Sequence, residues 1–237
     1  MDHLKKPQRW RWSLGRRIGK ILIMPFAKLK IFGQENLLLN TGKLLVSNHT
    51  SNLDPFFLGL AVNEELYFLA KEELFLPSKF FSWLINSFNA IPISRNLFLM
   101  NNNLFSPRKY FLTTIKKAIS LLKDQKTLVI FPEGTRNYRS ELLPFSNGAS
   151  FLAIRAGVPI IPTAILGIKD IWRGKIYKLI DNLPMENRPQ KSLRSEVIVK
   201  FGKPIYPPKQ FSARNQLINE LTQNTKRAIE MLIYAEN

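Results

Sequence analysis

A histidine and an aspartate five residues apart form the most chemically suggestive pair in this 237-residue chain. His49 and Asp54 follow the apolar stretch Lys43–Val46 and stand just before Pro55. A neutral imidazole can take a proton from a hydroxyl near neutral pH when one ring nitrogen faces that hydroxyl. The other ring nitrogen then needs an acceptor, which selects the tautomer and stabilises the imidazolium that forms. The pair therefore predicts a general base supported by a carboxylate.

The same two residues also fit a purely structural interpretation. Asp54 precedes Pro55 and is a favourable N-cap for a helix that begins there, in which case His49 is an ordinary loop histidine. Their position favours the chemical interpretation, because the pair follows a predicted strand, and open α/β sheets collect ligands at the carboxyl ends of their strands. With His49 as the base, a hydroxyl of the substrate would be the nucleophile.

A second loop, Phe131–Arg136, follows another apolar run and combines an acid, a glycine and an arginine. Gly134 allows the backbone to approach a ligand closely, and the planar guanidinium of Arg136 matches phosphate oxygens. Glu133 could accept a hydrogen bond from a substrate hydroxyl. A surface turn is the alternative, since Pro-x-Gly is turn chemistry. Arg95 ends another predicted strand, so we expect both arginines to face His49 across one edge of the sheet.

Short apolar runs alternate with longer helical stretches from Leu29 onward, which predicts an α/β fold. The runs are continuously apolar, as expected for a mainly parallel central sheet with helices on both faces. The predicted strands are Leu29–Phe32, Lys43–Ser47, Leu66–Ala70, Ala90–Ile93, Thr127–Phe131, Pro159–Leu166 and Glu196–Phe201. The predicted helices are Pro55–Val62, Glu72–Phe88, Pro107–Lys123, Asn147–Ala156 and Phe211–Tyr234. The length of the chain favours one such domain, residues 29–237.

The segment of residues 1–28 differs from the rest because it combines cations with tryptophans. Indole rings settle at the headgroup depth of a bilayer while Lys and Arg meet lipid phosphates, so Trp10, Trp12 and their basic neighbours predict an amphipathic membrane-associated helix. A disordered basic tail with one docked helix is the alternative. Apolar stretches fall short of the roughly 20 residues that span a bilayer, so we expect peripheral or monotopic association on the cytoplasmic face.

The chain carries a net charge of +18 and no cysteine. The charge indicates an anionic partner, which is nucleic acid, an anionic membrane surface or an acidic small substrate. Nucleic acid is the least favoured, because aromatic and basic residues interleave mainly in the N-terminal segment. The lack of cysteine excludes thiolate nucleophiles and cysteine-based metal sites, and no metal is expected.

Four short motifs occur along the chain in the same order as in a known enzyme family. Asn48–Pro55 resembles the first motif of glycerolipid acyltransferases of the 1-acylglycerol-3-phosphate (lysophosphatidate) type, a histidine followed by four residues and an aspartate. The other three motifs of that family resemble Ala90–Arg95, Phe131–Arg136 and Val158–Pro162. Two positions depart from the pattern, since Asn89 stands where a glycine is common and Ser94 where an acid is common.

This resemblance implies transfer of a fatty acyl chain to the free hydroxyl of 1-acylglycerol-3-phosphate, which gives phosphatidate. The donor would be an acyl-CoA or acyl-carrier-protein thioester, a co-substrate, and no cofactor is implied. The resemblance also implies His49 as the general base and Asp54 as its partner. The residues that it implies for acceptor binding are Arg95, Glu133, Gly134, Thr135 and Arg136.

Three alternatives stay open from the sequence. An acyltransferase for another lysophospholipid would use the same motifs. A Ser-His-Asp lipid hydrolase would keep the fold, but the sequence has no Gly-x-Ser-x-Gly element of the kind that such enzymes use. A basic nucleic-acid-binding module is suggested by the charge alone.

Overall fold

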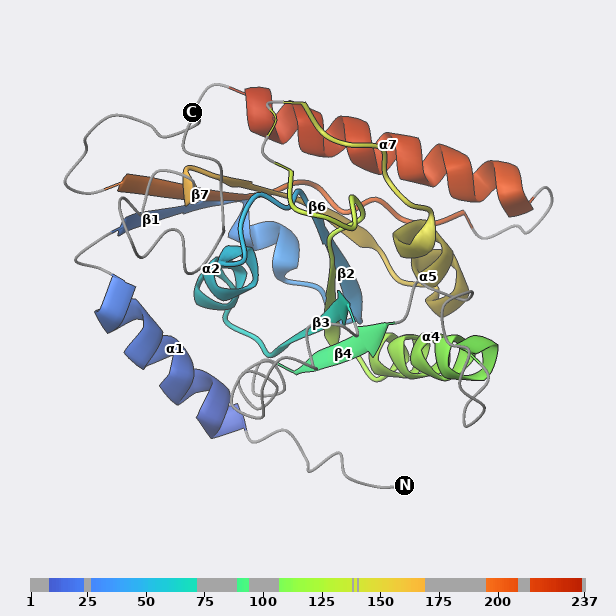
Figure 1. Cartoon of the computed structure of the whole chain (residues 1–237), viewed down its shortest axis with the longest axis horizontal. Coiled ribbons are helices and arrows are strands. Elements are labelled where there is room, and N and C mark those ends of the chain that lie inside the picture. The colour runs from blue at the N-terminus through green and yellow to red at the C-terminus, as the bar shows by residue number, and fades with distance from the viewer. Residues whose placement is uncertain are drawn as a thin grey trace.

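The computed structural model describes residues 9–23, 27–71, 89–93, 107–137, 139, 141–168, 195–208 and 214–235. These residues build a seven-stranded sheet in the order β1-β7-β6-β2-β5-β3-β4 (Figure 1). The strands are β1 (Ala27–Phe32), β2 (Lys43–Ser47), β3 (Leu66–Lys71), β4 (Ala90–Ile93), β5 (Thr127–Ile130), β6 (Ile160–Leu166) and β7 (Ser195–Phe201). Neighbouring strands of this sheet are parallel except β6 and β7. The prediction of a mainly parallel sheet is confirmed.

Helices cover both faces of the sheet. They are α1 (Arg9–Ile23), α2 (Asp54–Ala61), α4 (Pro107–Lys123), α5 (Gly148–Ala156) and α7 (Arg214–Tyr234), with a short 3-10 helix η1 (Gln34–Leu37). One apolar layer joins α2 to the sheet, and the other joins α4, α5 and α7 to its opposite face. Figure 1 shows α7 along one side of the sheet and α2 on the other. The predicted α/β fold with helices on both faces is therefore confirmed.

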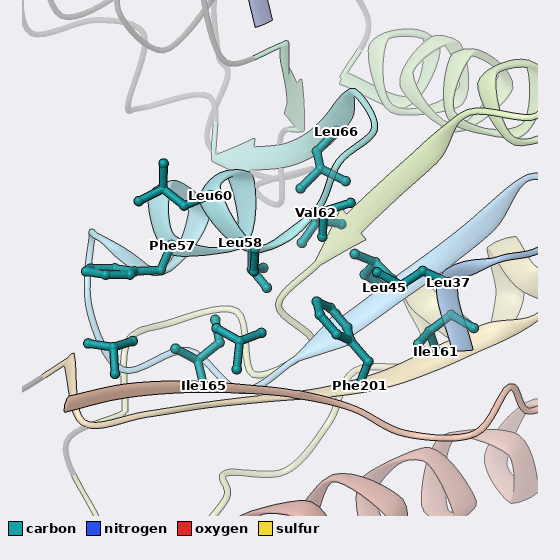
Figure 2. Close-up of a cluster of buried hydrophobic side chains, with 14 of the residues drawn as sticks. Leu37, Leu45, Phe57, Leu58, Leu60, Val62, Leu66, Ile161, Ile165 and Phe201 are labelled. Atoms are coloured by element: carbon teal, nitrogen blue, oxygen red, sulfur yellow. The ribbon is translucent and has the colours of Figure 1, made fainter. Parts of the chain in front are cut away.

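Strand β2 shows why the apolar runs carry no alternation. Leu45 belongs to the layer beneath α2, whereas Leu44 and Val46 belong to the layer beneath α4 and α5, and all three side chains are fully buried. Successive side chains of a strand point to opposite faces, so a strand between two helical layers is apolar on both faces along its centre. Figure 2 shows the first layer, where Phe57 and Leu58 of α2 lie over Phe201 and its neighbours.

The predicted elements agree closely with the observed ones. Lys43–Ser47, Ala90–Ile93 and Pro107–Lys123 have the predicted bounds, and the ends of the other described strands and helices predicted from Leu29 onward differ by at most three residues. The 3-10 helix η1 was not predicted, and α1 occupies only part of the predicted segment 1–28. The predicted helix Glu72–Phe88 lies outside the described residues. Strand β1 begins at Ala27, within the segment that the sequence analysis assigned to the membrane-associated helix.

Helix α1 packs along α2 through one stripe of its surface. Trp12 lies over Gly59, and the guanidinium of Arg16 donates to Oδ1 of Asn63 at 2.8 Å and to the carbonyl oxygen of Leu60 at 3.3 Å. Among the residues described here, no helix combines the length and the apolar character that crossing a membrane requires.

Asn89 leads into β4 in the left-handed region, with a φ of 52°. Its side-chain amide donates to Oε1 of Glu65 at 3.0 Å and to the carbonyl oxygen of Leu66 at 3.2 Å. Asparagine tolerates this conformation better than most residues do, and glycine tolerates it freely. The conformation gives a physical reason why asparagine stands here where a glycine is common in the resembled family.

Asn89→Ala should lower the free energy of unfolding by about 1–2 kcal/mol, because alanine adopts a left-handed φ only with strain and cannot form either hydrogen bond. Asn89→Gly is the matched control. It relieves the backbone while losing the same bonds, so its cost should stay below about 1 kcal/mol. Urea unfolding of the three proteins gives the comparison. An alanine variant as stable as the wild type would contradict a left-handed conformation at this position.

Candidate functional site

His49 and Asp54 meet beyond the carboxyl end of β2, as the sequence predicted. Nδ1 of His49 lies 2.7 Å from Oδ2 of Asp54. The side chain of Asp54 is completely buried, whereas that of His49 is 18% exposed. One ring nitrogen is therefore engaged by a carboxylate sealed from water, while the imidazole itself still reaches the surface. This is the arrangement that a carboxylate-supported base requires.

The carboxylate of Asp54 also organises the loop that carries His49. Its Oδ2 accepts the backbone N–H groups of Thr50 at 2.6 Å and Ser51 at 2.9 Å, and Oδ1 accepts the hydroxyl of Thr50 at 3.3 Å. A buried carboxylate is costly unless it is hydrogen-bonded, and these donors compensate it. The turn that they form presents His49 at its start.

The expected N-cap role of Asp54 is wrong. Helix α2 begins at Asp54 itself, and its N-cap is Leu53, without a side-chain capping bond. The reason is that the N–H of Asp54 bonds to the carbonyl oxygen of Ser51 at 3.1 Å, so the turn starts one residue earlier than expected. The side chain is left free to bond back to the loop and to the imidazole.

A phenylalanine supports the imidazole from its face. The rings of Phe131 and His49 are stacked, with centroids 4.2 Å apart and planes 21° apart. Asp54 holds the ring through Nδ1 and Phe131 restricts its tilt, so the two contacts act in different directions. This role of Phe131 was not predicted from the sequence. The available signal was an aromatic residue directly after an apolar strand, at the edge where the ligand site was expected.

Strand β6 and the loop after β5 hold the chain around His49. The side chain of Asn48 forms a reciprocal pair with Ile165 of β6, donating to its carbonyl oxygen at 2.9 Å and accepting its N–H at 2.8 Å. From the loop after β5, Glu133 accepts the N–H of His49 through Oε1 at 3.0 Å, and Asn137 donates its own N–H to the carbonyl oxygen of His49 at 2.7 Å. The N–H and the carbonyl oxygen of His49 are thereby bonded to the loop after β5, and the side chain of the preceding Asn48 is bonded to β6.

Glu133 is engaged on its second carboxylate oxygen as well. Oε2 accepts the side-chain amide of Asn137 at 2.9 Å and the backbone N–H of Leu143 at 3.0 Å. The expectation that Glu133 contacts a substrate hydroxyl stays a prediction. No feature of the sequence singled out Asn137, because it lies outside the four motifs and its contacts with Glu133 and His49 appear only in the folded chain.

The other expected acceptor residues lie in the same loop after β5. Gly134 is buried and has a φ of 69°, Thr135 is exposed and Arg136 is partly exposed. Because Phe131 and Glu133 both contact His49, this loop and the imidazole form one continuous site. Arg95 lies outside the described residues, so its expected place beside Arg136 stays a prediction.

Comparison with known proteins places both loops inside one family match. The Acyltransferase family model matches residues 28–166. Over 150 residues the chain is 32% identical to a chloroplastic 1-acyl-sn-glycerol-3-phosphate acyltransferase of Brassica napus, a match that covers 63% of this chain and 40% of that protein. Over 170 residues it is 28% identical to the 1-acyl-sn-glycerol-3-phosphate acyltransferase of Bacillus subtilis, with 70% of this chain and 78% of that protein covered.

A solved structure shares the fold. The crystal structure of the 1-acyl-sn-glycerophosphate acyltransferase of Thermotoga maritima superposes with a TM-score of 0.66, covering 99% of this chain and 86% of that one at 24% identity. The chain thus matches a known α/β architecture along nearly its whole length, although it spans less than half of the plant relative.

The contacts of Asp54 predict unequal costs for removing the two members of the pair. Asp54→Ala leaves two backbone N–H groups without their acceptor, so the free energy of unfolding should fall by about 2–4 kcal/mol. His49→Ala leaves both groups bonded to Asp54 and removes one stacked ring, which should cost about 1 kcal/mol. Chemical denaturation of both variants measures the difference. Equal costs would show that Asp54 does not organise the loop.

Proposed function

Because this chain belongs to the Acyltransferase family, we propose that it transfers a fatty acyl chain from a thioester to the free hydroxyl of 1-acylglycerol-3-phosphate, giving phosphatidate. The observation that carries the proposal is the 2.7 Å contact between Nδ1 of His49 and the buried carboxylate of Asp54. The names of the Brassica napus and Bacillus subtilis relatives support the choice of acceptor. The donor is an acyl-CoA or an acyl-carrier-protein thioester, both of which are anionic and suit a chain of net charge +18.

In this proposal the acceptor hydroxyl is the nucleophile. His49 takes its proton through Nε2 while the hydroxyl oxygen attacks the thioester carbonyl carbon, and Asp54 stabilises the imidazolium through Nδ1–H. When the tetrahedral intermediate collapses, the carbon–sulfur bond breaks and the sulfur receives the proton from His49. The products are the new ester and a free thiol, and His49 returns to its neutral state. No acyl group is attached to the protein at any step.

The oxyanion of the tetrahedral intermediate needs hydrogen-bond donors. The N–H groups of Thr50 and Ser51 are already bonded to Asp54, which directs the assignment to the first turn of α2. Pro55 has no N–H, and the N–H groups of Asp54 and Phe57 bond to the carbonyl oxygens of Ser51 and Leu53. We therefore assign the N–H of Phe56 as the donor, with the dipole of α2 in support.

The acceptor's phosphate needs cations and backbone donors on the other side of the imidazole. We assign this role to Arg136 with Gly134 and Thr135, and to Arg95 by its motif. A guanidinium forms paired hydrogen bonds with phosphate oxygens, and it does so best where water is partly excluded. The partly exposed Arg136 beside the His49 loop has the chemistry for this role.

We also propose that α1 rests on an anionic membrane surface, which would hold the enzyme beside its lipid acceptor. Leu14, Ile18 and Ile21 are 48%, 48% and 70% exposed and lie four and three residues apart, so they form one apolar stripe. The contacts of α1 with α2 use a different stripe, which includes Trp12 and Arg16. An exposed apolar stripe flanked by cations is typical of a helix that lies in the bilayer interface.

The proposed reaction is tested with purified protein and labelled lysophosphatidate, supplied with acyl-CoA or with acyl-carrier-protein thioester in separate reactions. Parallel reactions with lysophosphatidylglycerol and lysophosphatidylethanolamine report acceptor choice. His49→Ala should lower kcat by about 1000-fold or more, because the reaction loses its base. His3→Ala is the matched control, since His3 is the only other histidine of the chain. Full activity of His49→Ala would overturn the proposal.

The membrane proposal predicts that exchanging Leu14, Ile18 and Ile21 for serine weakens partitioning onto phosphatidylglycerol-containing liposomes by about 100-fold, because three side chains no longer leave water. Sedimentation with the liposomes measures the bound fraction. Met231→Ser is the control, because Met231 is 72% exposed but lies on α7. Partitioning that the triple substitution leaves unchanged would rule out α1 as the contact surface.

A further inference from the structure

The backbone of His49 is held on both sides by residues of the loop after β5. Its N–H donates to Oε1 of Glu133 at 3.0 Å, and its carbonyl oxygen accepts the N–H of Asn137 at 2.7 Å. The position of the Cα atom decides where the imidazole can reach. These two bonds therefore determine how the ring meets both Asp54 and an incoming hydroxyl.

The carboxylate of Glu133 is largely committed to the protein. It accepts three N–H groups, from His49, from the side chain of Asn137 and from Leu143, at 2.9–3.0 Å. A carboxylate offers about four acceptor positions, so little capacity is left for a substrate hydroxyl. Its negative charge also opposes the approach of an acceptor that carries a phosphate, because like charges repel. Both arguments indicate that Glu133 holds protein groups in place and does not bind the acceptor.

Asn137 completes the arrangement from a buried position. Its side-chain amide donates to Oε2 of Glu133 at 2.9 Å and to the carbonyl oxygen of Glu141 at 2.6 Å, while its own Oδ1 accepts the N–H of Arg139 at 2.9 Å. The residue is only 5% exposed. One side chain thus orients the carboxylate that holds the N–H of His49, while the backbone of the same residue holds the carbonyl oxygen.

We infer that Glu133 and Asn137 form a clamp on the backbone of His49 and are positioning residues for the proposed proton transfer. Glu133 then supports the general base and is not a ligand of the acceptor. The inference rests on the proposed acyl transfer. Proton transfer requires the base to stand about 3 Å from the hydroxyl oxygen, and a misplacement of about 1 Å can cost about 100-fold in rate. A clamp therefore affects kcat far more than acceptor affinity.

Glu133→Gln tests this inference in the full chain. The amide has one acceptor oxygen, and its NH₂ group would face the donors of Asn137 and Leu143. We expect kcat to fall about 30–100-fold while the KM for lysophosphatidate changes less than about threefold. Arg136→Lys is the comparison for a true acceptor ligand and should raise that KM more than it lowers kcat. Glu35→Gln is the matched control, because Glu35 is exposed on η1, outside the clamp, and its charge change is the same.

Hydrogen exchange gives a readout that does not depend on activity. The backbone N–H of His49 should exchange about tenfold faster in Glu133→Gln than in the wild type, because its acceptor is weakened, while the global melt changes little.

The outcomes separate the inference from the proposed function. A raised acceptor KM with unchanged exchange at His49 would overturn the clamp and make Glu133 an acceptor ligand. Should Glu133→Gln fail to fold, Asn137→Ala removes the side-chain bonds to Glu133, Glu141 and Arg139 but keeps the backbone bond to His49. An unchanged kcat in that variant would also overturn the clamp. A wild-type protein without acyl transfer, but with exchange at His49 that responds to Glu133→Gln, would refute the proposed function while supporting the clamp.

Discussion

The buried carboxylate of Asp54 is the constraint on which the site depends. An ion sealed from water is stable only when hydrogen bonds replace its hydration, and here two backbone N–H groups and the imidazole of His49 supply them. These bonds require the loop to turn back on the start of α2. The same turn brings His49 to the surface with Nδ1 engaged, so folding of the loop and orientation of the imidazole are one event.

The sheet explains why residues far apart in the sequence converge on His49. Strand β2 lies between β5 and β6 and is parallel to both, so the carboxyl ends of the three strands share one edge. From β5 come Phe131 and Glu133, and from β6 comes the backbone of Ile165, which pairs with Asn48. Apolar layers on both faces hold the strands in register, and the polar groups beyond the strand ends inherit that register.

The sequence predicted the fold well because the physical signal is local. A strand between two helical layers is buried along its whole length, and every residue of β2 and β5 is buried. The pairing of His49 with Asp54 was also accessible, since five residues span one loop. The start of α2 was not accessible, because the same spacing also suits an N-cap at Asp54, whereas in the structure the N–H of Asp54 bonds to Ser51 and the helix begins at Asp54.

The sequence predicted that the loop after β5 lies beside His49, but not the individual contacts between the two segments. The bonds between His49 and the residues Glu133 and Asn137 join two loops that no periodicity in the sequence relates. A glutamate in such a loop could equally be predicted to bind the substrate. The stacking of Phe131 on His49 depends on the pairing of β2 with β5, which only the folded sheet reveals. Asn89 carried a weak signal, since its left-handed backbone accounts for its place at a position often held by glycine.

The central claim is that His49, held by Asp54, meets the acceptor's hydroxyl with its other ring nitrogen. A crystal structure with lysophosphatidate and an unreactive thioether analogue of the donor tests this directly. The account predicts Nε2 of His49 about 3 Å from the free hydroxyl oxygen, with Nδ1 still bonded to Asp54. An ordered acceptor whose hydroxyl lies beyond hydrogen-bond reach of Nε2, or an imidazole turned away from Asp54, would contradict it.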